Sequence, residues 1–149
     1  NINPPIPRIL LAQVKRPDGA FVVDAISTDG GCIPRNVILS QGLSLVKLDV
    51  LTLTEFAQKT SLNPARMLRL TAKGHLSVGA DADITIYDYA TQTPKMSFVE
   101  GRKVLFKGEV LGKNANIICT ERGQKAIEAR GLKAIVVDPG LPVDRVKAL

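Results

Sequence analysis

Residues 61–89, SLNPARMLRLTAKGHLSVGADADITIYDY, contain the change of secondary structure around which the rest of the chain can be arranged. Asn63 and Pro64 predict the start of a helix, with Asn63 as the N-cap and Pro64 at the first helical position, where a missing amide hydrogen costs nothing. Residues 84–89 (ITIYDY) are rich in β-branched and aromatic side chains and predict a strand. This stretch therefore separates a helical region from a region of strands.

Glycine and aspartate punctuate the connection between this helix and this strand. Gly74 and Gly79 permit tight turns, because glycine adopts backbone angles that are closed to other residues. Asp81 and Asp83 can accept hydrogen bonds from nearby backbone amides. We expect a structural role for these residues, and not a catalytic one.

Upstream, the sequence predicts one buried strand at about residues 20–28. Residues 20–26 (AFVVDAI) are apolar and alternate poorly, as in a parallel strand that is covered by helices on both faces. Before it, three prolines among residues 1–8 predict an extended, helix-free beginning, and residues 9–14 predict a short strand. After it, a short helix is expected from Pro34 to residue 40, closed by Gly42.

Downstream, the sequence predicts a hairpin and then a helix and a strand. Residues 97–100 and 103–107 flank a predicted tip at Glu100 and Gly101, and Gly108 marks a second turn. Gly131 follows the helical spacing of residues 121–130 and precedes a strand at residues 132–137, so it predicts the end of that helix. Upstream of residues 61–89, Thr52 and Glu55 predict a capping box at the start of another helix.

Composition excludes several classes of protein. The chain has 149 residues, of which 45% are hydrophobic, and it carries a net charge of +6. The lysines and arginines are scattered and no stacking aromatic motif accompanies them, so we expect a solvated surface and no nucleic-acid partner. No apolar run approaches the ~18 residues of a membrane span. With two cysteines and no secretion signal at the beginning of the sequence, a cytoplasmic location is expected.

Asp29 is the most informative polar residue. It follows the C-terminal end of the predicted buried strand, where barrel enzymes place catalytic groups. A carboxylate there could bind a metal or act as a base toward a metal-bound water. Asp-Gly after a strand is also a common turn, and these residues alone favour the turn.

A resemblance to a known family changes this weighting. Residues 61–66 (SLNPAR) followed by residues 73–84 (KGHLSVGADADI) resemble the closing signature of the amidohydrolase superfamily, which includes dihydroorotases, hydantoinases and N-acyl-amino-acid deacylases. Residues 99–104 and 107–110 resemble the hairpin that comes next in that family. The resemblance covers about residues 20–112, and the combined motif is specific.

The resemblance implies a fold between α/β and α+β. Residues 1–72 would be the C-terminal end of a catalytic (β/α)8 barrel, namely its last strand at about 20–28 and the helices that follow. Residues 73–149 would be a small, mainly antiparallel β-sandwich portion with a C-terminal helix and strand. Such a barrel takes ~250 residues, so we expect the chain to be a C-terminal fragment.

The resemblance also assigns roles to residues. Asp29 would ligate the metal or take a proton from the attacking water and pass it to the leaving nitrogen. Gly30, Gly31 and Cys32 would form the loop beside the substrate. Arg35 could pair with a substrate carboxylate, although a surface role is favoured for Arg35 and an ordinary thiol for Cys32.

The sequence also departs from the family pattern. The family's ligating histidines have no counterpart, because the single histidine, His75, lies in the exit turn and is expected at the surface. A divalent metal, with zinc as the expected ion, would belong to the complete enzyme, since one carboxylate cannot supply the three or four protein ligands of zinc. None is expected to bind well to this chain alone.

Three functional hypotheses follow. The first is the C-terminal part of a metal-dependent hydrolase of amide or cyclic amide C–N bonds, inactive as an isolated fragment. Its partners would be a small-molecule amide substrate and the remainder of the barrel or other copies of the chain. The second is a non-catalytic β-sandwich packing or assembly module from the same superfamily. The third, nucleic-acid binding, depends only on the net charge.

Overall fold

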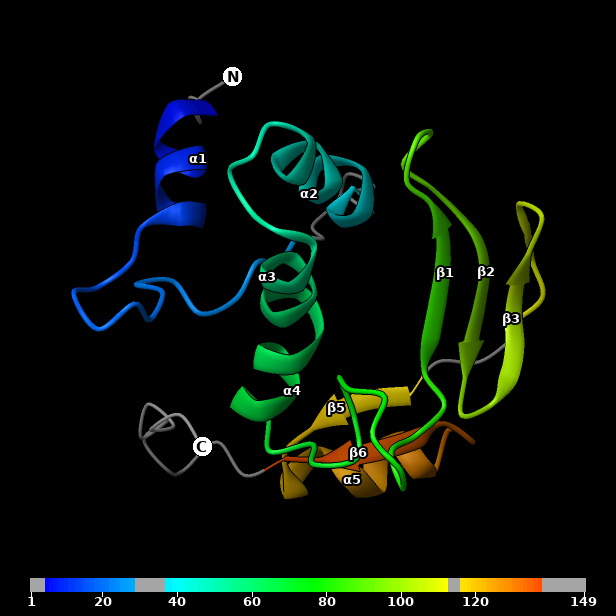
Figure 1. Cartoon of the computed structure of the whole chain (residues 1–149). Coiled ribbons are helices and arrows are strands. Elements are labelled where there is room, and N and C mark those ends of the chain that lie inside the picture. Colours follow the sequence, from blue (N-terminus) through cyan, green and yellow to red (C-terminus); the bar gives the residue numbers. More distant parts are fainter. Residues whose placement is uncertain (1–4, 29–36, 113–115, 138–149) are drawn as a thin grey trace.

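The structure is a computed structural model that describes residues 5–28, 37–112 and 116–137. A helical part and two sheets make up the described residues (Figure 1). The helices are α1 (Pro5–Gln13), α2 (Ile38–Lys47), α3 (Leu53–Ala57), α4 (Asn63–Met67) and α5 (Glu121–Glu128), with a π-helical turn η1 (Gln58–Leu62) between α3 and α4. The strands are β1 (Ile84–Asp88), β2 (Thr93–Val99), β3 (Arg102–Phe106), β4 (Glu109–Val110), β5 (Asn116–Cys119) and β6 (Lys133–Val136).

Helix α2 packs against α3 and forms the core of the helical part. Leu43, Val46, Leu51 and Phe56 are buried together there. Gly42 does not close a helix, as the sequence suggested, but lies buried inside α2. A Cβ atom on Gly42 would lie 2.2 Å from Cε2 of Phe56, so the absent side chain lets the ring pack against the helix. Close packing therefore overrides the helix-stopping tendency of glycine at this position.

Helices α3 and α4 form one continuous helical run through η1. The predicted capping box is confirmed, since the Thr52 side chain accepts from the Glu55 amide and the Glu55 carboxylate accepts from the Thr52 amide. The predicted N-cap role of Asn63 is wrong, because α4 begins at Asn63 itself, whose backbone angles are helical. Pro64 lies within the run, where the wider π-turn before it reduces the clash that proline makes with the preceding turn.

The beginning of the chain also differs from the prediction. Residues 9–14 form no strand, and α1 includes Pro5 and Pro7. Proline is tolerated in the first turn of a helix because its missing amide hydrogen has no helical partner there. Ala12 of this helix is buried, whereas Ile6, Leu10 and Leu11 are exposed.

Residues 20–28 run along the helical part without joining a sheet. A single isolated bridge pairs Lys15 with Phe21, and residues 22–28 form no strand. A strand in a parallel barrel is held by neighbours on both sides, and no described segment lies beside this one in such a ladder. Its assignment as the last barrel strand stays a prediction.

The four-stranded sheet is antiparallel, in the order β1-β2-β3-β4. The hairpin predicted around Glu100 and Gly101 is confirmed, and both residues have positive φ angles of 49° and 74°. Lys107 and Gly108 form the second predicted turn with φ angles of 48° and 86°. Two successive positive φ angles match the twist of antiparallel hairpins.

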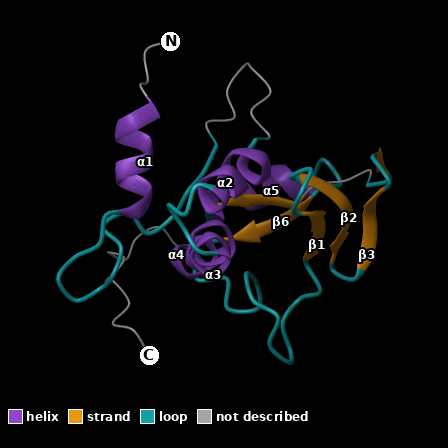
Figure 2. Ribbon diagram, turned by 45° about the horizontal axis from the view of Figure 1, so that its top comes forward, coloured by secondary structure: helices purple, strands orange, loops and turns teal. Residues whose placement is uncertain are grey.

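Strands β5 and β6 form a separate parallel pair connected through α5, as labelled in Figure 1; Figure 2 shows β6 and α5 from another side. The predicted helix and last strand are present, and Gly131 ends the helix with a φ angle of 71°. Strand β5 was not predicted, and its parallel pairing differs from the mainly antiparallel arrangement expected here. A parallel pair needs a crossover connection, which the eight-residue α5 provides.

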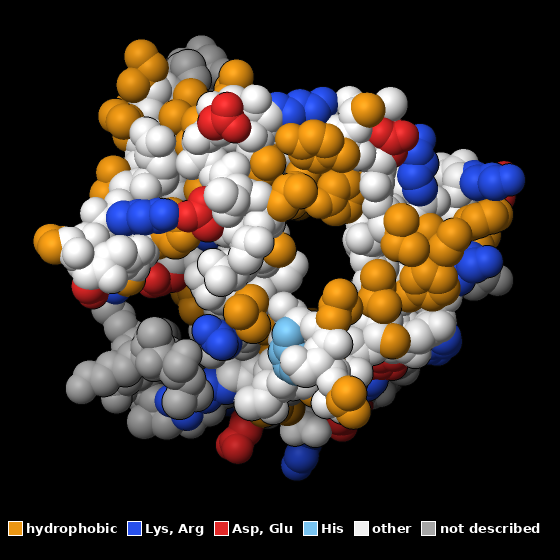
Figure 3. All heavy atoms as spheres, in the orientation of Figure 1, with side chains coloured by type: hydrophobic (Ala, Val, Ile, Leu, Met, Phe, Trp, Pro, Cys, Tyr) orange, Lys and Arg blue, Asp and Glu red, His pale blue; other side chains and the backbone are white. Residues whose placement is uncertain are grey.

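Among the described residues, three side-chain hydrogen bonds connect the helical part to the turn between β1 and β2 of the antiparallel sheet. Gln92 Nε2 donates to the Ser40 carbonyl (3.0 Å) and the Ser44 hydroxyl (2.9 Å), and Lys47 Nζ donates to the Ala90 carbonyl (2.8 Å). An opening separates the helices from the sheet elsewhere on the face shown in Figure 3. Within the described residues, no helix has the length and apolar character needed to cross a bilayer.

Candidate functional site

The predicted site residues lie outside the described residues. Asp29, Gly30, Gly31, Cys32 and Arg35 all fall in the segment 29–36. Their assignment as catalytic, metal-binding and substrate-loop residues therefore stays a prediction. The structure does describe the segment that leads into Asp29 and the helices against which that segment lies.

Three hydrogen bonds hold residues 23–26 on the helical run. The Ile26 amide donates to the Lys59 carbonyl at 3.0 Å, and Asn63 Nδ2 donates to the Asp24 carbonyl at 2.7 Å. The Lys59 ammonium donates to the Val23 carbonyl. Both Lys59 and Asn63 come from η1 and the start of α4, so the π-turn provides the contact surface for this segment.

Lys59 is a buried lysine, with 0% of its surface exposed. Its Nζ atom lies 3.8 Å from the centroid of the Phe21 ring, in cation–π geometry. Burial lowers the pKa of Lys59, and the negative charges of Asp24 and Glu55 partly oppose that effect. Sequence analysis missed this residue because an isolated lysine in a helix is most often exposed.

Beside this contact, Lys15 and Glu55 form an ion pair with 2.5 Å between Nζ and Oε1. The hydrogen bond from Lys15, together with the one from the Thr52 amide, lowers the pKa of Glu55. This pair joins the turn after α1 to the first turn of α3. The ion pair therefore connects the two segments on the side of the helical run along which residues 20–28 lie.

The connection from α4 to β1 explains why residues 61–66 and residues 73–84 occur together in the motif, because Gly74 lies against Ser61 and Ala65. A Cβ atom on Gly74 would lie 2.5 Å from the Ser61 carbonyl oxygen and 2.8 Å from the Ala65 Cβ, and its φ angle is 81°. Glycine is therefore required where the exit turn crosses the helix that contains Ala65. The structural role predicted for Gly74 is confirmed.

Lys73, Asp81 and Asp83 form an ionic cluster at this connection. Lys73 Nζ lies 2.8 Å from Asp81 Oδ2 and 2.6 Å from Asp83 Oδ2, and Asp83 Oδ1 accepts from the Glu100 amide at 2.8 Å. These bonds, to Asp81 and then to Asp83, raise the pKa of Lys73. Burial alone would raise the pKa of Asp83, but the Lys73 ammonium and the Glu100 amide outweigh it, so the pKa is lowered. The sequence indicated the aspartates but not their cation.

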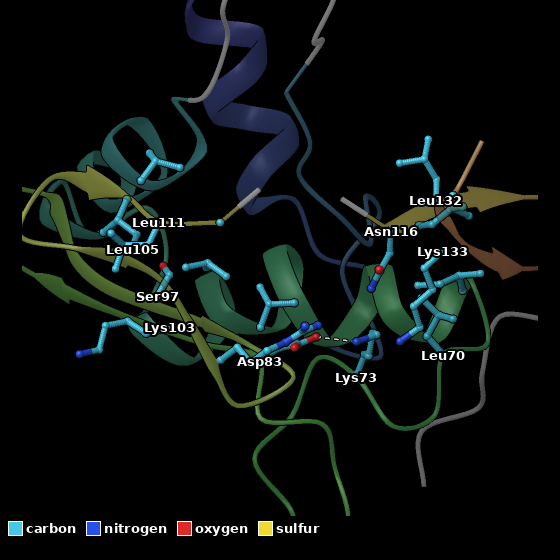
Figure 4. A pocket seen from close by; sticks show the side chains of 18 residues that line it. Leu70, Lys73, Asp83, Ser97, Lys103, Leu105, Leu111, Asn116, Leu132 and Lys133 are labelled. Atoms are coloured by element: carbon cyan, nitrogen blue, oxygen red, sulfur yellow. Dashed lines mark hydrogen bonds and ion pairs between the residues drawn. The ribbon is translucent and has the colours of Figure 1, made fainter. Parts of the chain in front are cut away.

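A cleft of about 910 Å³ lies between the antiparallel sheet and the β5–β6 pair. Figure 4 shows Lys73 and Asp83 at one side of it, with Ser97 and Leu105 from the antiparallel sheet facing Asn116 from β5. Glu100 joins its two sides, because the carboxylate accepts from Asn116 Nδ2 at 3.4 Å and from Lys133 Nζ. Most polar side chains that line this cleft thus bond to a partner within the described residues, which indicates a structural junction.

Within residues 5–28, 37–112 and 116–137, no group of three or more His, Cys, Asp and Glu side chains is arranged to hold a metal ion. His75 instead bonds within its own turn, with 2.8 Å between Nε2 and the Thr71 carbonyl. Its location in the exit turn is as predicted, although it is half-buried. The described residues therefore supply no metal site by themselves.

Part of this chain matches a known protein family. Residues 41–111 match the family described as the Amidohydrolase family. This segment covers most of α2, the helical run, the exit connection and the antiparallel sheet. The resemblance to the metal-dependent amidohydrolase superfamily is thereby confirmed.

Among individual proteins, two dihydroorotases are similar. That of Syntrophus aciditrophicus (strain SB) is 50% identical over 48 residues, which cover 32% of this chain and 11% of the relative. That of Methanothermobacter thermautotrophicus (strain Delta H) is 29% identical over 113 residues, which cover 60% of this chain and 26% of the relative. The chain thus spans between about a tenth and a quarter of the curated relatives that it matches.

One solved structure is also similar in part. It is the formyltransferase/hydrolase complex (FhcABCD) from Methylorubrum extorquens, in complex with methylofuran. The match has a TM-score of 0.41 and 29% sequence identity, and it covers 54% of this chain and 16% of that chain.

Proposed function

We propose that this chain is the C-terminal part of a hydrolase that cleaves the C–N bond of a small amide or cyclic amide. The observation that carries the proposal is the family match over residues 41–111, together with the similarity to two dihydroorotases. The complete enzyme would use a divalent metal, with zinc as the expected ion. Its metal ligands would come mostly from the rest of a (β/α)8 barrel.

Asp29 is the residue of this chain that would take part in the reaction. A carboxylate at the end of the last barrel strand could accept a proton from the attacking water and transfer it to the leaving nitrogen. When bound, the metal would lower the pKa of that water and polarise the carbonyl. Gly30, Gly31 and Cys32 would shape the adjacent loop, and Arg35 could bind a substrate carboxylate.

The isolated chain would be inactive, because one carboxylate does not complete the three or four ligands that zinc requires. It would function with the remainder of the barrel or with other copies of itself. Exposed apolar side chains support such a partner, among them Ile6 and Leu11 on α1 and Ile86 on β1. Large apolar side chains at a surface often mark an interface.

The first test compares the intact mass of the native gene product with the 16.0 kDa of this chain. A much larger mass supports the proposal, and the whole product is then assayed on a panel of cyclic amides with and without a chelator. Asp29→Asn should lower kcat by ~10²–10⁴-fold, the typical contribution of general acid–base catalysis. Asp18→Asn, in an exposed turn, serves as the matched control and should retain activity.

A second candidate is a non-catalytic packing or assembly module. The family match favours it in one respect, because residues 41–111 exclude Asp29 and consist of helices, the exit connection and the sheet. A native mass of 16.0 kDa without amide hydrolysis would support this candidate and contradict the first. Activity that survives Asp29→Asn at the level of the control would contradict only the role of Asp29.

A further inference from the structure

Lys59 lies in the helical run and is buried, which is unusual for a lysine. Its side chain is wholly buried, and its ammonium points toward the segment that precedes Asp29. We propose that Lys59 is a positioning residue whose buried ammonium fixes residues 21–26 and thereby the point from which the chain enters Asp29. The catalytic consequence of this inference rests on the proposed function, but the anchoring itself does not.

Lys59 contacts this segment at three places. The ammonium lies 3.8 Å from the centroid of the Phe21 ring and donates a hydrogen bond to the Val23 carbonyl. The Lys59 carbonyl accepts from the Ile26 amide at 3.0 Å. One residue therefore holds the beginning, middle and end of a six-residue segment.

Few other backbone contacts restrain this segment. Its start is held by the Lys15–Phe21 bridge and by the Val22 amide, which donates to the Val14 carbonyl at 3.0 Å, whereas residues 23–28 join no strand. Phe21 and Ile26 pack against the buried cluster of α2 and α3, which restrains the two ends by apolar contact. Between these ends, the backbone carbonyls of Val23 and Asp24 are bonded by Lys59 and Asn63.

The free-energy cost of burying an ammonium also indicates that the charge of Lys59 has a role. Removal of an ammonium from water is costly, and a side chain needed only to fill space would be apolar. The burial of Lys59 is therefore explained by the contacts that its charge makes, namely the Val23 carbonyl and the face of the Phe21 ring. Both contacts are stronger with a cation than with a neutral group. They also lie within eight residues of Asp29 in the sequence.

Hydrogen exchange on the full chain tests the anchoring without any assay of activity. Lys59→Met keeps the length and most of the volume of the side chain and removes the ammonium. We expect the Ile26 amide to exchange at least ~10-fold faster, as in local opening, whereas the amides of β2 and β3 keep their rates. Lys47→Met is the matched control, because Lys47 also donates to a backbone carbonyl and lies over an aromatic ring, but it is exposed and contacts Ala90 and Tyr89.

Unchanged exchange of Ile26 in Lys59→Met would overturn the proposal, as would equal acceleration in Lys47→Met. If Lys59→Met does not fold, Phe21→Leu provides the second variant, since it keeps an apolar side chain and removes the ring under the ammonium. The same local acceleration is then expected. An unchanged rate would again overturn the anchoring.

Kinetics of the native gene product test the catalytic consequence. Misplacement of a catalytic group by about 1 Å can lower the rate ~10²-fold, so Lys59→Met should lower kcat while KM changes little and metal content is retained. Faster exchange with unchanged kcat would overturn the link to Asp29. If the unsubstituted protein hydrolyses no amide, the proposed function fails, whereas the exchange result still decides whether Lys59 anchors the segment.

Discussion

Gly42→Ala is expected to destabilise the protein, although the same change in an ordinary helix would stabilise it. Alanine is favoured over glycine inside a helix by ~1 kcal/mol. Gly42 lies within α2, so this gain should apply. The Phe56 ring, however, occupies the space that a side chain at Gly42 would need.

The magnitude follows from the distances. The new Cβ would lie 2.2 Å from Cε2 of Phe56 and about 3 Å from the next two ring atoms, whereas carbon atoms in contact are ~3.5–4.0 Å apart. The ring would have to move by more than an ångström, but Phe56 is 6% exposed and packs beside Leu43, which is 0% exposed. Overpacking of this kind costs ~1–3 kcal/mol, so a net loss of about 1 kcal/mol is expected.

Urea denaturation of the purified protein would measure this loss. Gly123→Ala in α5 is the matched control, because its Cβ would meet no atom closer than 3.2 Å. The cost of Gly42→Ala should shrink by ~1 kcal/mol in the background of Phe56→Leu, as a double-mutant cycle would show. Stabilisation by Gly42→Ala alone, or a cost that is the same in both backgrounds, would refute the reasoning.

Three further predictions concern the ends and junctions of the elements. Thr52→Ala removes the N-cap of α3 and should cost ~1 kcal/mol of unfolding free energy in urea titrations. Because the pKa of Asp83 is lowered and that of Lys73 is raised, the stability from their pair should be lost as pH falls through the lowered pKa of Asp83 and as pH rises through the raised pKa of Lys73. Asp83→Asn should therefore flatten the acid side of a stability–pH curve, and an unchanged acid side would argue against the pair. Glu100→Gln should speed hydrogen exchange in β5 and β6 but not in β1, since it weakens the bond from Lys133. The same change in exchange rate in all three strands would contradict a junction at Glu100.

The hairpins and the capping box could be predicted from the sequence because local backbone chemistry decides them. Gly101 and Gly108 follow residues that also adopt positive φ angles, and such turns tolerate few other residue types. The Thr52–Glu55 capping box satisfies amides within four residues of each other. No distant contact is needed for either feature.

The predictions failed where a contact with a residue distant in the sequence outweighed a local preference, or where the local preference allowed two structures. Gly42 remained in a helix because of Phe56, and the side chain of Asn63 bonds to the Asp24 carbonyl instead of capping a helix. Pro5 and Pro7 begin α1, since the proline rule permits the first turn of a helix as well as an extended segment. Strand β5 has four residues and becomes recognisable through its pairing with β6.

The sequence by itself indicated the superfamily, through a motif whose glycines and aspartates meet local steric and hydrogen-bonding needs. The resemblance to that superfamily then predicts a catalytic role for Asp29. Only the tertiary structure showed why Gly74 must lack a side chain and why Lys59 is buried. The reason is physical. Turn and cap preferences act over a few residues, whereas the burial of Lys59 depends on Phe21 and Val23, which lie more than thirty residues away in the sequence and come near only when the chain folds.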